Sequence, residues 1–124
     1  MHENDIKLAN GELISIKVNF LTLHLIKKMK IDKLSDKNNI LKEQYDALED
    51  KSSLEALDMQ ERIEDNQFNI ASKIIYVILR SNGKKLDFED TLALCPFDPD
   101  EIAKIVTDFS EELEKYKKKE DMKM

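Results

Sequence analysis

The sequence contains only two glycines, two prolines and one cysteine in 124 residues. Scarce Gly and Pro argue against a loop-rich all-β fold, and a 37% charged, 41% hydrophobic composition favours helices. The single cysteine, Cys95, cannot form an internal disulfide, and no apolar run follows a basic start. We therefore expect one small cytoplasmic domain without a secretory signal or a transmembrane span.

Residue types that carry catalysis are also scarce. The only histidines are His2, near the terminus, and His24, in an apolar stretch where a structural role is favoured. The chain has no CxxC, HExxH, GxGxxG or GxxxxGK motif. Cys95 lies within LALCPF and resembles a small buried hydrophobic residue, while the acidic run at 98–101 suits a helix cap better than a calcium loop. We predict that the protein is not an enzyme and has no catalytic, cofactor-binding or metal-binding residues.

The net charge of −6 disfavours nucleic-acid binding, because that binding depends on Lys and Arg that neutralise phosphates. The charge is unevenly distributed: residues 32–69 carry −6 and residues 87–114 carry −9, whereas residues 70–86 carry +4. These blocks are either solvated helix faces or surfaces that attract a partner of opposite charge.

The first third of the chain combines a hairpin signal with helical patterns. Asn10-Gly11 predicts a two-residue turn with positive φ, between strands at 6–9 and 12–18. A helix is predicted over 19–31, capped by Asn19. The polar stretch 32–52 has isolated apolar residues and predicts a weakly helical connection.

The stretch IASKIIYVILRSNGKK, residues 70–85, is apolar around most of a helix circumference and predicts the core helix. We expect one long helix over 53–82, stopped by Asn82 or Gly83 in the left-handed conformation. Asp87 and Asp98 are expected to cap the helices that follow. The sequence predicts a mainly α fold, a single domain with four to five helices and an N-terminal β-hairpin, divided as follows: hairpin 1–18, helix 19–31, connection 32–52, helix 53–82, short helix 87–95, helix 99–119, frayed tail 120–124.

Two apolar patterns are candidates for contacts between molecules. The last helix has an apolar seam at 4,3,4,3 spacing, which suits packing on another helix in the same chain or in a second copy. A hairpin alone is marginally stable, so its apolar face must pack on helices or pair with another copy. The candidate partner-binding or self-association residues are Ile14, Ile16, Ile102, Val106, Phe109, Leu113 and Tyr116.

Three segments together resemble the tail assembly chaperones of long non-contractile-tailed phages of Gram-positive bacteria. They are LANGELISIKVNFLTLHLIKKMKIDKL, ASKIIYVILRSNGKKLDFEDTLAL and DPDEIAKIVTDFSEELEKYKKK, which cover well over half of the chain. The acidic span 32–67 has no counterpart in the resemblance. The resemblance implies a helical protein that binds and solubilises the phage tape measure protein and helps recruit the tail tube protein.

The resemblance further implies a homo-oligomer in the cytoplasm of the infected host, absent from the mature virion, and without nucleic-acid or membrane partners. It also implies a longer product made by ribosomal frameshifting, for which the codons of Lys117-Lys118-Lys119 would be the slippery site. The alternative hypothesis is a small acidic helical adaptor or inhibitor that binds a basic partner.

Overall fold

The computed structural model of the protein describes residues 5–122, and side chains from residue 5 to residue 119. Within this part of the chain it has five helices and one two-stranded antiparallel hairpin, which confirms the predicted mainly α fold. The elements, in chain order, are β1 (Asp5–Lys7), β2 (Leu13–Ser15), α1 (Phe20–Lys28), α2 (Ile31–Asp46), α3 (Leu54–Ser81), α4 (Phe88–Leu92) and α5 (Pro99–Met122).

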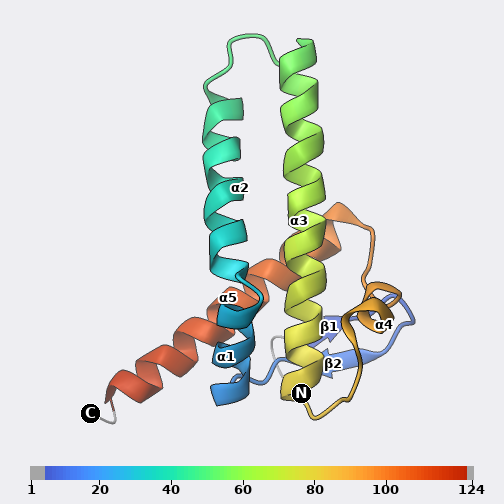
Figure 1. Cartoon of the computed structure of the whole chain (residues 1–124), viewed down its shortest axis with the longest axis vertical. Helices are drawn as coiled ribbons and strands as arrows, with labels where there is room; N and C mark the ends of the chain where they lie inside the picture. The colour runs from blue at the N-terminus through green and yellow to red at the C-terminus, as the bar shows by residue number, and fades with distance from the viewer. Residues whose placement is uncertain (1–4, 123–124) are drawn as a thin grey trace.

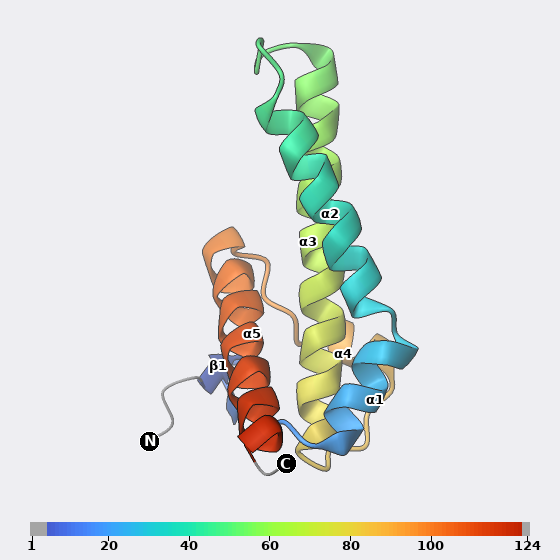
Figure 2. The ribbon, with the colours of Figure 1, turned by 90° about the vertical axis from the view of Figure 1, so that its left-hand side faces the viewer.

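α3 is the central element of the fold. The C-terminal half of α3 lies among α1, α4, α5 and the hairpin. The N-terminal half of α3 lies side by side with α2, and the two extend away from the other elements (Figure 1). α5 and α1 lie on different sides of α3 (Figure 2), and α3 contacts α1, α2, α4 and α5. This arrangement explains why the stretch 70–79 is apolar around its circumference, since it must pack against several elements at once.

The core is formed mainly by α3. Ile75, Val77 and Ile78 are fully buried, and the hairpin, α1 and α5 supply further buried side chains. α3 ends at Ser81 with Asn82 as its C-cap, and Gly83 has a φ of 83°. The N–H of Gly83 donates to the carbonyl of Arg80 and the N–H of Lys84 to that of Leu79, which is the Schellman arrangement. Of the two residues predicted to stop this helix, Gly83 has the left-handed conformation.

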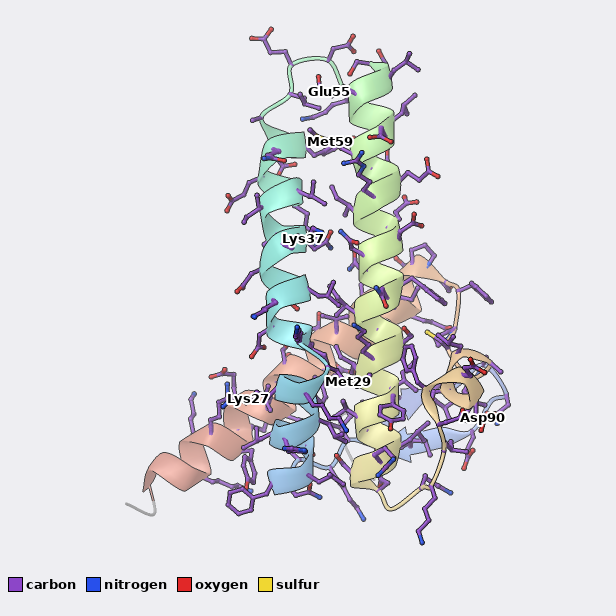
Figure 3. All side chains as sticks on the ribbon, viewed as in Figure 1. Lys27, Met29, Lys37, Glu55, Met59 and Asp90 are labelled. Atoms are coloured by element: carbon purple, nitrogen blue, oxygen red, sulfur yellow. The ribbon has the colours of Figure 1, made fainter. Side chains whose placement is uncertain are left out.

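The extended part of the molecule is an antiparallel two-helix arm, formed by α2 and residues 54–69 of α3. Met59 lies on the side of α3 that faces α2 (Figure 3). A pair of asparagines forms a polar layer between the two helices of the arm. The Nδ2 of Asn66 donates to the Oδ1 of Asn38 at 3.3 Å, and Asn38 is buried. The buried and half-buried residues recur at coiled-coil spacing: Ile31, Leu34, Asn38, Leu41 and Tyr45 on α2, Leu48 just beyond the end of α2, and Ala56, Met59, Ile63, Asn66 and Ile70 on α3.

The prediction of a weakly helical connection at 32–52 is wrong in extent. α2 is a regular helix of 16 residues, and only residues 47–53 connect it to α3. The polar residues that made this stretch look weak are on its exposed side, and the buried Asn38 breaks the apolar pattern. The seam on α3 provides the stabilisation that helix propensity alone does not supply.

The hairpin differs from the predicted one in its turn. Ile6 pairs with Ile14, and the N–H of Leu8 donates to the carbonyl of Glu12, which leaves a three-residue loop. Only Gly11 in this loop has a positive φ, of 88°. A two-residue turn would place Ile6 and Ile14 on opposite faces, whereas this register buries both. The strands are three residues each, much shorter than 6–9 and 12–18.

Other element ends also shift from their predicted positions. The helix predicted over 19–31 divides at Lys30, whose φ of 58° separates α1 from α2. α4 ends at Leu92 and not at residue 95. α5 continues to Met122, so the tail predicted to fray from residue 120 is helical to that point. Residues 1–4, including His2, and residues 123–124 lie outside the described residues.

Candidate functional site

An apolar groove lies between the middle of α3, α4 and the start of α5. Its volume is about 700 Å³, which falls within the roughly 300–1,000 Å³ typical of ligand-binding clefts. Five of its side chains are large and apolar or aromatic, and two are carboxylates. We call this the aromatic groove, and its lining residues are Glu64, Asp65, Gln67, Phe68, Asn69, Ser72, Phe88, Leu92, Phe97, Pro99 and Ile102.

Stacked rings form one side of the aromatic groove. Phe68 of α3 and Phe97 of the connection before α5 lie with centroids 5.5 Å apart and ring planes only 8° from parallel. Phe88 makes an edge-to-face contact with Tyr76, with centroids 5.9 Å apart. Although it is stacked on Phe68, Phe97 is 82% exposed. A large aromatic side chain therefore stacks on one neighbouring ring and has most of its surface in water.

Local hydrogen bonds hold the segment that carries Phe97. The Asp87 carboxylate accepts from the N–H of Asp90 and caps α4. The carbonyl of Leu94 accepts from the N–H of Ala9 at 2.8 Å, which ties the segment to the hairpin loop. Beyond Phe97, the carboxylate of Asp98 accepts from the N–H of Asp100 at the start of α5. Phe97 thus lies in a short connection that is fixed on both sides.

The surroundings of the aromatic groove are acidic. Glu64 and Asp65 line it, and residues 87–103 contain six carboxylates and no Lys or Arg. Asp90 of α4 and Lys27 of α1 lie on different sides of α3 in the view of Figure 3. Neither Glu64 nor Asp65 forms an ion pair within the part of the chain whose side chains are described. The negative charge around this groove is therefore not neutralised by described side chains of the protein itself.

The predicted association residues lie mostly inside the protein. Ile102 is 6% exposed and lines the aromatic groove, and Phe109 is 3% exposed. The seam of α5 packs on α3, so its main contacts are within the chain. Whether these residues also contact another molecule stays a prediction. Three of the seven are buried and four are half-buried: Ile14, Ile102 and Phe109 in the first group, Ile16, Val106, Leu113 and Tyr116 in the second.

The large exposed apolar side chains are at other positions. Phe20, 75% exposed, meets the ring of Tyr116 edge to face at 6.5 Å. Leu54, 86% exposed, lies at the tip of the arm where α3 begins. The protein therefore presents apolar surface that its own described residues leave uncovered. The full set is Leu13, Phe20, Leu21, Ile40, Leu54, Leu57, Leu92 and Phe97.

Sequence reasoning missed the aromatic groove. Phe97 is in a connection without helical periodicity, and Phe68 is surrounded by polar residues on α3, so no pattern linked them. One local signal was available. Phe97 lies between Pro96 and Asp98 in an acidic connection, and no helical or strand pattern around it indicates where its ring would be buried. Only the packing of α4 and α5 against α3 brings these side chains together.

Cys95 and His24, the described residues considered for catalysis, differ in their burial. Cys95 is 1% exposed, as its sequence context suggested, and burial raises the pKa of its thiol to about 11. His24 is exposed, so the apolar stretch around it does not bury the imidazole. Within residues 5–122, no three His, Cys, Asp or Glu side chains are grouped to hold a metal ion. In the same range, no helix combines the length and apolar character needed to cross a bilayer.

Comparisons with family models, curated proteins and solved structures found no match. The fold and the aromatic groove are therefore interpreted from their own geometry, and the resemblance to tail assembly chaperones stays a hypothesis.

Proposed function

We propose that the protein is a phage tail assembly chaperone that binds and solubilises the tape measure protein and helps recruit tail tube subunits. The resemblance of the three sequence segments motivates the proposal. The observation that supports it in the structure is the aromatic groove, in which Phe97 is stacked on Phe68 and 82% exposed. A site of this kind suits non-covalent binding of apolar side chains from another protein, because most of its lining surface is apolar.

The remaining exposed apolar residues support contacts at more than one place. Phe20 near the C-terminal half of α5 and Leu54 at the arm tip are well separated along the structure. Several weak contacts with one elongated partner produce strong total binding while each contact stays reversible. Such contacts would cover an aggregation-prone helix before assembly, and tube subunits would later displace the chaperone by competition. Self-association of chaperone copies along the partner is part of this proposal.

Co-expression with a candidate tape measure protein from the same gene neighbourhood tests the function. We expect the tape measure protein to move from the insoluble to the soluble fraction and to copurify with several copies of the chaperone. A Phe97→Ala variant is expected to reduce the soluble fraction, whereas Gln44→Ala, a change at an exposed polar residue of α2 outside the groove, is the comparison and is expected to leave it unchanged. If the tape measure protein stays insoluble with the wild-type protein, the proposed function is wrong.

The second candidate function is an acidic adaptor or inhibitor of a single basic partner. The uncompensated carboxylates around the aromatic groove favour it. Stoichiometry and salt dependence separate the two functions. An inhibitor binds its target one to one, and its affinity falls steeply as the salt concentration rises. Many copies on one elongated partner would instead support the chaperone function.

A further inference from the structure

We infer that the aromatic groove binds an amphipathic α-helix whose apolar face carries large side chains and whose flanking polar positions are Lys or Arg. This inference rests on the proposed function in taking the partner to be helical. It adds the chemistry by which the partner is recognised at one defined place on the protein.

The shape of the groove suits a helix. It is bounded by α3, α4 and the start of α5, and the two strands of the hairpin do not line it. Without a strand edge at this place, an extended peptide has no row of backbone groups to pair with. A helix satisfies its own backbone hydrogen bonds and needs only a surface for its apolar side chains.

Phe97 is the expected anchor of the interaction. Its ring stacks on Phe68 and is 82% exposed, so a partner that covers it buries a large aromatic surface. Exposed Leu92 and buried Ile102 extend the apolar lining on the α4 and α5 sides. Aromatic residues that become fully covered at the centre of an interface commonly carry a large share of its affinity.

The charge around the groove defines the rest of the partner. Glu64 and Asp65 line the groove, and Glu89, Asp90, Asp100 and Glu101 are exposed on the neighbouring elements. None of these six forms an ion pair with a side chain between residues 5 and 119. Lys or Arg beside the apolar face of the partner would compensate this charge, whereas an acidic helix would be repelled.

Fluorescence anisotropy with two labelled synthetic peptides tests the inference. Both are amphipathic helices of about 20 residues with the same Leu and Phe positions, one with Lys and Arg on its polar face and the other with Glu. We expect the basic peptide to bind and the acidic one not to bind. The affinity should fall several-fold between about 50 and about 300 mM salt, because exposed charges are screened. Equal affinity for the two peptides would overturn the inference.

Matched variants locate the binding. Phe97→Ala is expected to lower the affinity for the basic peptide roughly 10- to 30-fold. Glu64→Gln with Asp65→Asn is expected to lower it about threefold. The comparison variants carry changes outside the groove, at the equally exposed Leu54→Ala and at the exposed acidic pair Glu43→Gln with Asp46→Asn of α2. They should bind as the wild type does. An equal loss in groove and comparison variants would contradict the assignment. Circular dichroism of each variant verifies that it is folded.

A second copy of the protein is the competing occupant of the groove. Analytical ultracentrifugation of the wild type and of Phe97→Ala separates the two cases. One outcome would assign the groove to self-association and overturn the inference: the wild type is a dimer, Phe97→Ala is a monomer, and the basic peptide does not bind. The outcome is also separable from the proposed function. If the peptide binds as expected but the tape measure protein stays insoluble, only the function fails. If Phe97→Ala solubilises the tape measure protein as well as the wild type does, only the inference fails.

Discussion

Shortening a central side chain of α3 provides a quantitative test of where the stability of the fold resides. Ile78 is fully buried, so Ile78→Ala removes apolar contacts and leaves a cavity that the surrounding elements fill only in part. Substitutions of this kind cost about 2–5 kcal/mol. A domain of this size has a total unfolding free energy of about 6–15 kcal/mol, so the loss is a large fraction of it.

The same change should lower the melting temperature by about 6–25 °C, at about 3–5 °C for each kcal/mol in a domain of this length. Ile40→Ala in α2 is the control, because that isoleucine is 56% exposed. Its effect should stay within about 0.5 kcal/mol, since alanine also has the better helix propensity. Urea unfolding followed by circular dichroism measures both free energies. The assignment of α3 as the core is refuted if both variants lose the same stability, or if Ile78→Ala loses less than about 1 kcal/mol.

Three further substitutions test other parts of the structure. Phe109→Asp puts an unpaired charge at a position that is 3% exposed, so we expect an unfolded protein in circular dichroism; a folded monomer would show that the α5 seam is not core. In urea unfolding, Asn38→Leu alone should cost about 1–3 kcal/mol because the amide of Asn66 loses its buried partner. Replacing both with Leu should restore or raise stability, and a larger loss in the double variant would argue against a paired polar layer. Burial raises the pKa of the Cys95 thiol from 9.0 to about 11, so the folded state keeps this proton to a higher pH than the unfolded state does. The resulting stability is complete below pH 9.0 and is lost as the pH rises towards about 11, so the stability difference between wild type and Cys95→Ala should shrink over that range; a constant difference would contradict it.

Features governed by local chemistry could be predicted from the sequence. Gly83 ends α3 because a left-handed residue closes the last turn, and Asp87 caps α4 through its side chain. The apolar stretch 70–79 likewise identifies the core helix, since its apolar residues cover most of the circumference. In each case the residues that determine the structure are neighbours in the sequence.

Features that depend on distant packing could not be predicted. The Asn10-Gly11 pair indicates a turn but does not specify its length, which is determined by the shared burial of Ile6 and Ile14. α2 looks weak in isolation because its seam includes the buried Asn38, whose partner is on α3. The aromatic groove needs three elements to come together, and its most exposed large apolar residue, Phe97, is in a connection without periodicity. The candidate site therefore becomes visible only in the folded structure.

Hydrogen exchange measured by mass spectrometry, with and without the tape measure protein, tests most directly whether the aromatic groove receives another protein. The account predicts that backbone amides in the connection 93–98 and in α4 exchange more slowly in the complex, together with those at 64–69 of α3. Protection confined to the arm tip or the hairpin, with exchange at 88–98 unchanged, would contradict it.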